Sequence, residues 1–210
     1  MLKRSILYMD SDKKRLLVLI AILLGVVVFA VGVSFVLPLL ERGGKLPSEI
    51  SDARFRAGEI SADVVRLSNE ANDRIKALGA LDASKEQEKA AGLIKEAEDK
   101  NKEAYEKAVA LSNELAKMAE KLPEVQSEKV KQVLQQSITV EIALVTEFIQ
   151  YSKDLNLFLD QVNEFISNST PANRARLQSM EITVNERVGR INQLNEEFLR
   201  HMETLDKLTK

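Results

Sequence analysis

The chain contains no cysteine and no tryptophan, and His201 is its only histidine. Without cysteine it can form neither a disulfide framework nor a covalent haem site. A di-iron site in a helical bundle needs a Glu-x-x-His motif on two helices, but the residue three before His201 is phenylalanine. The sequence also has no glycine-rich phosphate loop and no nucleophile–base motif. We therefore expect no metal site, no cofactor and no enzymatic activity.

Proline, glycine and aromatic residues are scarce: 4 prolines and 8 glycines occur, and aromatic residues make up 5% of the chain. Alanine, leucine, glutamate and lysine are abundant instead, which is typical of long helices. This composition predicts an all-α fold. The 30 basic residues nearly cancel the 32 acidic ones, so we expect no nucleic-acid partner.

One long apolar run, residues 16–40, contains no ionisable side chain between Arg15 and Glu41. A helix needs about 20 residues to cross a hydrocarbon core about 30 Å thick, and this run exceeds that length. It is also longer than the apolar part of a cleaved signal peptide, which has about 7–15 residues. We predict a single transmembrane helix over residues 16–40 that anchors the chain in a lipid bilayer.

The charges beside this run predict its orientation. Five basic and two acidic side chains precede it, and basic residues next to a span favour a cytoplasmic N-terminus. We therefore predict a short cytoplasmic tail over residues 1–15, a linker over 41–50 and an extracytoplasmic domain over 51–208. The setting that fits best is a bacterial cell membrane.

Apolar residues after the linker recur every three or four positions, which is the spacing of one helical face. The pattern and its breaks predict four helices, over about 48–81, 85–122, 127–167 and 171–208. The clearest seam, in the second helix, consists of Ala90, Ile94, Ala97, Asn101, Ala104, Ala108, Leu111, Leu115, Met118 and Leu122. Steps of four and three residues are those of a coiled coil.

The breaks between the predicted helices contain residues that start or stop helices. Ser84 followed by Gln87 is a capping-box pattern. Pro123 cannot continue a helix, whereas Thr170 and Pro171 fit an N-cap and a first helical position. Because turns this short favour antiparallel neighbours, we predict an up-down-up-down four-helix bundle with coiled-coil-like packing. The alternative is a pair of helical hairpins whose core is completed by another chain.

Polar residues stand on the predicted apolar seams at Asn101, Ser137, Glu141 and Asn195. Antiparallel pairing of the last two helices about residue 169 brings Ser137 level with His201. The same pairing brings Glu141 within about a turn of Asn195 and Arg200. A buried carboxylate needs a partner, which Arg200 or His201 would supply. We interpret these six residues as a buried polar layer that fixes helix register; the alternatives are a ligand or proton-sensing pocket, and simple exposure.

These predictions favour a membrane-anchored protein with a structural or protein-interaction role, such as a scaffold or adaptor. Its partners would be the bilayer and either another protein or a second copy of the chain. The layout is similar to the outer ligand-binding bundle of bacterial chemoreceptors, which also begins directly after a first span. That resemblance implies the alternative function, a ligand-binding accessory or sensor subunit. Because no second span or cytoplasmic signalling module follows in this sequence, such a subunit would signal through a partner.

Overall fold

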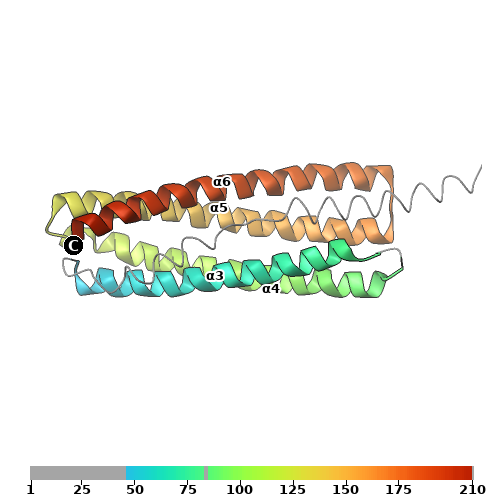
Figure 1. Cartoon of the computed structure of the whole chain (residues 1–210), viewed down its shortest axis with the longest axis horizontal. Helices are drawn as coiled ribbons and strands as arrows, with labels where there is room; N and C mark the ends of the chain where they lie inside the picture. Colours follow the sequence, from blue (N-terminus) through green and yellow to red (C-terminus); the bar gives the residue numbers. More distant parts are fainter. Residues whose placement is uncertain (1–45, 83–84, 210) are drawn as a thin grey trace, which may run out of the picture. The chain divides into compact units, whose positions relative to one another are not determined.

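The computed structural model describes residues 46–82 and 85–209, which form four long α-helices (Figure 1). The helices are α3 (Ser48–Ala80), α4 (Gln87–Glu120), α5 (Glu128–Ser167) and α6 (Pro171–Thr209), with a short 3-10 helix, η2 (Leu122–Glu124), after α4. The described residues contain no strand, so the all-α prediction is confirmed. The predicted helix ends agree with the observed ones to within about two residues.

The predicted tail (1–15), the predicted transmembrane helix (16–40) and residues 41–45 of the predicted linker lie outside the described residues. The end of that linker differs from the prediction, because residues 48–50 already form the first turn of α3. The Pro47 carbonyl starts this turn by accepting hydrogen bonds from the N–H groups of Ile50 and Ser51. None of the helices within residues 46–82 and 85–209 is long and apolar enough to cross a membrane.

Two of the predicted helix boundaries have the expected chemistry. Thr170 Oγ1 accepts a hydrogen bond from the N–H of Asn173 at 3.1 Å, so it caps α6, and Pro171 is the first residue of that helix. Pro123 lies in η2, just beyond the end of α4. The third boundary includes Ser84, which lies outside the described residues.

The described chain divides into two compact units, and each of the four helices contributes one segment to each unit. Unit 1 comprises residues 67–82, 85–102 and 152–186. Unit 2 comprises residues 46–66, 103–151 and 187–209.

Unit 1 has an apolar core to which all four helices contribute. Two ion pairs join α3 to α4: Arg74 Nε lies 2.6 Å from Glu96 Oε2, and Lys100 Nζ lies 3.4 Å from Glu70 Oε2. The earlier residue of α3 pairs with the later residue of α4, so the two segments are antiparallel. The core includes Leu67, Ile75, Leu78, Ala90, Ile94, Ala97, Phe158, Phe165, Leu177 and Val184.

Unit 2 is built in the same way. Arg56 Nε lies 2.9 Å from Glu114 Oε2 and Lys107 Nζ lies 2.6 Å from Asp63 Oδ2, so the α3 and α4 segments are antiparallel here as well. The core includes Ile50, Ala57, Val64, Ala104, Leu115, Leu134, Phe148, Tyr151, Ile191, Phe198 and Leu205. The α4 seam predicted from the sequence is buried at every position except Leu122, which lies beyond the helix end.

A charged clamp, the Glu147 carboxylate held by Arg187 and Arg190, joins α5 to α6 within unit 2. Glu147 Oε1 accepts hydrogen bonds from Arg187 Nη1 at 2.8 Å and from Arg190 Nε at 2.7 Å. Burial alone would raise the pKa of Glu147, but the two arginines outweigh it and hold the pKa below its ordinary value. The clamp therefore favours the ionised carboxylate at neutral pH.

Candidate functional site

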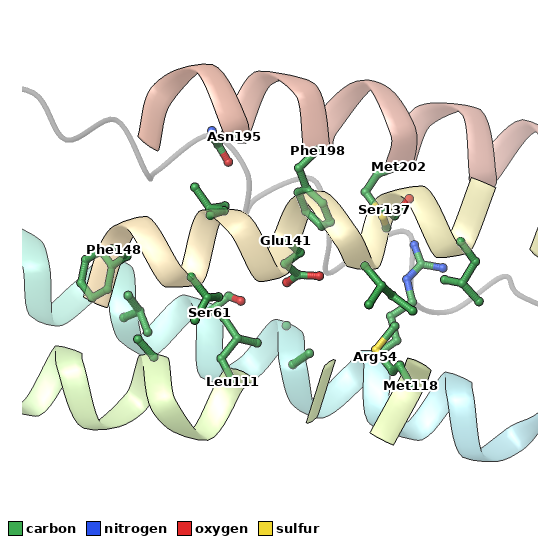
Figure 2. A pocket seen from close by; sticks show the side chains of 18 residues that line it. Arg54, Ser61, Leu111, Met118, Ser137, Glu141, Phe148, Asn195, Phe198 and Met202 are labelled. Carbon is green, nitrogen blue, oxygen red and sulfur yellow. The ribbon is translucent and has the colours of Figure 1, made fainter. Parts of the chain in front are cut away.

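A cavity of about 60 Å³ lies within unit 2, and side chains of all four helices line it (Figure 2). One ordered water needs about 10–15 Å³ of such volume, so the cavity accommodates about four to six water-sized groups. Most of the wall is apolar and includes Val64, Leu111, Met118, Leu144, Phe148, Phe198 and Met202. Small-molecule sites are mostly apolar with a few placed polar groups, and this smaller cavity shares that chemical character.

Glu141 is the most unusual residue of this wall. Figure 2 shows its side chain directed from α5 into the space between the helices. Its carboxylate forms no hydrogen bond and no ion pair with any residue that the structure describes. Burial raises its pKa from the ordinary 4.5 to about 7, against the lowering effect of the nearby Arg54 cation. The carboxyl group is therefore about half protonated at neutral pH.

Arg54 of α3 lines the same cavity and is only 6% exposed. Its Nη2 lies 3.6 Å from Asp206 Oδ1 of α6, which is an ion pair but too long for a hydrogen bond. Nε and Nη2 are covered by protein atoms and donate no hydrogen bond within the described chain. Burial lowers the pKa of the guanidinium, and Asp206 acts in the opposite direction. Arginine remains charged at neutral pH, so a buried cation that is ion-paired to Asp206 borders the cavity.

Three of the residues predicted for a polar layer line this cavity: Ser137, Glu141 and Asn195. Ser137 Oγ donates a hydrogen bond to the carbonyl of Val133 at 2.9 Å, so its donor is used within its own helix. Asn195 is 8% exposed. The three residues therefore line one space, Ser137 and Glu141 from α5 and Asn195 from α6.

Asn101 belongs to unit 1 and is not among the cavity residues. It is 1% exposed, and its Nδ2 donates hydrogen bonds to the carbonyl of Ser152 at 2.7 Å and to Asn156 Oδ1 at 2.8 Å. Ser152 Oγ returns a bond to the Asn101 carbonyl at 3.4 Å. This cluster joins α4 to α5 and uses both donors of the Asn101 amide nitrogen.

Arg200 and His201 do not line the cavity, so the prediction that one of them pairs with Glu141 is wrong. Arg200 is exposed. The His201 side chain is 25% exposed, and its Nε2 lies 3.8 Å from Glu197 Oε1, one turn earlier on α6. Antiparallel pairing about residue 169 predicts how far along α6 a residue lies, but it does not predict on which side of the helix its side chain lies. The cation near Glu141 is instead Arg54, from a different helix.

The sequence prediction does not include Arg54 and Asp206, because it pairs only the last two helices. Both residues stand beside buried apolar positions, Arg54 next to Ala53 and Asp206 next to Leu205. The sequence signal for them is a pair of oppositely charged residues beside the apolar faces of α3 and α6.

One family model matches part of the chain: residues 100–203 are similar to a family described as an alpha/beta hydrolase of unknown function (DUF1400). All of these residues are described, and they form helices and the η2 turn without any strand. An alpha/beta hydrolase carries its nucleophile on a strand-to-helix turn in a Gly-x-Ser-x-Gly motif. Gly189 is the only glycine of the matched stretch, so the match brings neither that fold nor that site to this chain. No curated protein and no solved structure is significantly similar to it.

Proposed function

We propose that this chain is the ligand-binding or sensor component of a membrane-anchored helical protein, and that the unit 2 cavity binds a small molecule. The observation that carries this proposal is the unpartnered Glu141 carboxylate in an apolar cavity. Buried polar groups are normally satisfied, as Asn101 is in unit 1. An ionisable group kept unpartnered in a cavity, with a pKa moved toward neutrality, is the pattern expected of a functional site.

The membrane part of the proposal rests on the sequence. The 25 residues from Leu16 to Leu40 carry no ionisable side chain, and the basic residues before them favour a cytoplasmic tail over 1–15 and an extracytoplasmic position for the helices. We also propose an antiparallel up-down-up-down four-helix bundle with coiled-coil-like packing. The α3–α4 ion pairs within each unit and the buried seam of α4 support it.

The proposal is for binding and not for catalysis. The Ser137 hydroxyl donates its hydrogen bond to the Val133 carbonyl and not to Glu141, which lies one turn later. The cavity wall contains no histidine, and no group of three metal-ligating side chains occurs among residues 46–82 and 85–209. These arrangements support a site that holds a ligand without activating a nucleophile.

Thermal unfolding of the full-length protein in lipid nanodiscs tests this function. The panel consists of small amines, carboxylates and amino acids. A ligand present at 100 times its Kd stabilises the folded state by about 2.7 kcal/mol, which is about 5–10 °C in Tm for a chain of this size. Ala108→Leu, which fills the cavity from α4, should abolish the shift. Its exposed neighbour provides the matched control Val109→Leu, which should preserve it. An unchanged Tm with every compound of the panel would refute the proposal.

A second candidate, the scaffold or adaptor role, is favoured by two exposed apolar side chains in unit 1. Leu157 of α5 is 56% exposed and Ile182 of α6 is 60% exposed. Contiguous exposed apolar surface marks protein contacts, whereas single exposed apolar side chains are common on protein surfaces, so these two positions need a direct test. A photo-crosslinker placed at either position in cells should capture a protein partner or a second copy, whereas one at the exposed Lys153 should not. Equal capture from all three positions would contradict a specific contact.

A further inference from the structure

We infer that the unit 2 cavity takes a small organic cation, a primary ammonium on a short aliphatic chain, and that the ammonium pairs with Glu141. This inference rests on the proposed function, because it names the ligand class of the same cavity.

The cavity presents a carboxylate, whereas most of the neighbouring guanidinium is covered. Nε and Nη2 of Arg54 are covered by protein atoms, so a ligand in the cavity does not reach them. The Glu141 oxygens make no hydrogen bond, yet they are not among the covered atoms. A ligand therefore meets an acceptor with negative charge, and two of the three guanidinium nitrogens of Arg54 beside it are out of its reach.

The charges at the cavity wall also favour a cationic ligand. Arg54, from α3, is already compensated by Asp206 of α6 at 3.6 Å. The α4 residues of the wall are apolar, and those of α6 are Asn195, Phe198 and Met202, none of which carries charge. With Glu141 ionised, Arg54, Asp206 and Glu141 together carry a net charge of −1 beside a mostly apolar space. A carboxylate in such surroundings is stabilised by a partner of opposite sign.

The hydrogen-bonding capacity and the size of the cavity narrow the ligand further. The donor of Ser137 is used by a backbone carbonyl, so the polar groups that the wall still offers Glu141 are those of Ser61 and Asn195 and the remaining guanidinium nitrogen of Arg54. An ammonium brings three donors together with its charge. The volume of about 60 Å³ fits about four to six non-hydrogen atoms. Phe148 and Phe198 provide apolar surface for a short chain, and an aromatic face also attracts a cation.

Binding by this route exchanges a proton for the ligand. An aliphatic amine resembles the lysine side chain, whose ordinary pKa is about 10.4, so it arrives already protonated. Glu141 must lose its own proton to pair with it, and that proton goes to solvent. With a Glu141 pKa of about 7, about half a proton is released per ligand at pH 7. Between pH 6 and pH 8 the ionised fraction rises from about 9% to about 91%, so affinity should rise about tenfold.

Isothermal titration calorimetry on the full-length protein in nanodiscs tests the inference with three probes of similar size: n-butylammonium, n-butyrate and n-butanol. Titrations at pH 6 and pH 8, each in two buffers of different ionisation enthalpy, give both affinity and proton release. We expect n-butylammonium to bind about tenfold more tightly at pH 8, with release of protons. Glu141→Gln should remove this pH dependence and most of the affinity. The control Glu128→Gln, on the same helix with its side chain 85% exposed, should change neither.

The folding of Glu141→Gln is checked by circular dichroism at pH 5.5, where the wild-type carboxyl is mostly protonated and the two proteins should melt alike. Binding of n-butyrate without binding of n-butylammonium would refute the inference that the ligand is a cation. It would still support the proposal that the cavity binds a small molecule. Equal binding of n-butanol and n-butylammonium, or unchanged n-butylammonium binding by Glu141→Gln, would overturn it as well. If none of the three binds, the inference fails, while the proposed function is decided separately by the wider melting panel.

Discussion

Replacing Glu141 by glutamine should remove a pH dependence of folding stability that this one carboxyl group creates. Burial raises its pKa in the folded chain to about 7, from an ordinary 4.5. The folded chain therefore keeps this proton over a range in which the unfolded chain has lost it. The stabilisation is complete below about pH 4.5 and is lost as the pH rises through 7. Folding stability should thus fall with rising pH, the reverse of the effect of a salt-bridged carboxylate.

The size of the effect follows from the two pKa values. They differ by about 2.5, and each pKa unit corresponds to about 1.36 kcal/mol, so the full effect is about 3 kcal/mol. Most of it falls between pH 5 and pH 8. Glutamine cannot ionise in this range, so Glu141→Gln should lack this contribution. At pH 5 the variant and the wild type should be of similar stability, and at pH 8 the variant should be more stable.

Urea unfolding of the full-length protein in detergent micelles, followed by circular dichroism at pH 5, 6, 7 and 8, measures this difference. Other titrating groups cancel when the variant is subtracted from the wild type. Glu128→Gln should follow the wild type at every pH. Glu141→Leu should likewise flatten the pH profile and keep or raise the Tm at pH 8, because an apolar side chain replaces a buried charge. A difference between the wild type and Glu141→Gln that stays constant within about 0.5 kcal/mol would refute the reasoning.

Three further substitutions test the Arg54–Asp206 ion pair, the Asn101 cluster and the α6 cap by thermal unfolding. Arg54→Leu should cost about 3–5 kcal/mol because Asp206 is left buried without its cation, and adding Asp206→Leu should recover most of the loss; a double variant as unstable as the single one would contradict this. Asn101→Ala should cost about 1–3 kcal/mol, since its two partners on α5 lose their donor. Thr170→Ala should lower the Tm by about 2–4 °C through loss of the α6 cap, whereas Thr139→Ala on the exposed face of α5 should change it by less than about 1 °C.

The helices could be predicted from the sequence because their causes are local. The 4-3 spacing from Ala90 to Met118 forces those side chains onto one face, and all of them are buried. Proline and threonine at the helix ends act on the adjacent turn alone. Each of these effects is complete within a few residues, so no knowledge of the partner helix is needed.

The cavity could be predicted only in part, because its chemistry depends on which faces meet. Ser137, Glu141 and Asn195 were found as polar residues on apolar seams, and they line one space. Arg200 and His201 lie at the expected level of α6 but outside the cavity. The true cation, Arg54, comes from a helix more than eighty residues earlier in the chain. Such a contact follows from tertiary packing and has no local signature.

The cavity also has a mechanical consequence. A void of about 60 Å³ per molecule amounts to about 36 mL/mol, within the range of about 20–100 mL/mol by which unfolding shrinks a protein–water system. Because the volume change of unfolding scales with such voids without being equal to them, a pressure of 100 MPa should shift the equilibrium toward the unfolded chain by on the order of 1 kcal/mol. A molecule that fills the void removes its contribution to the volume change of unfolding. Hydrostatic pressure should therefore distinguish the empty protein from the occupied one, whatever the chemistry of the occupant.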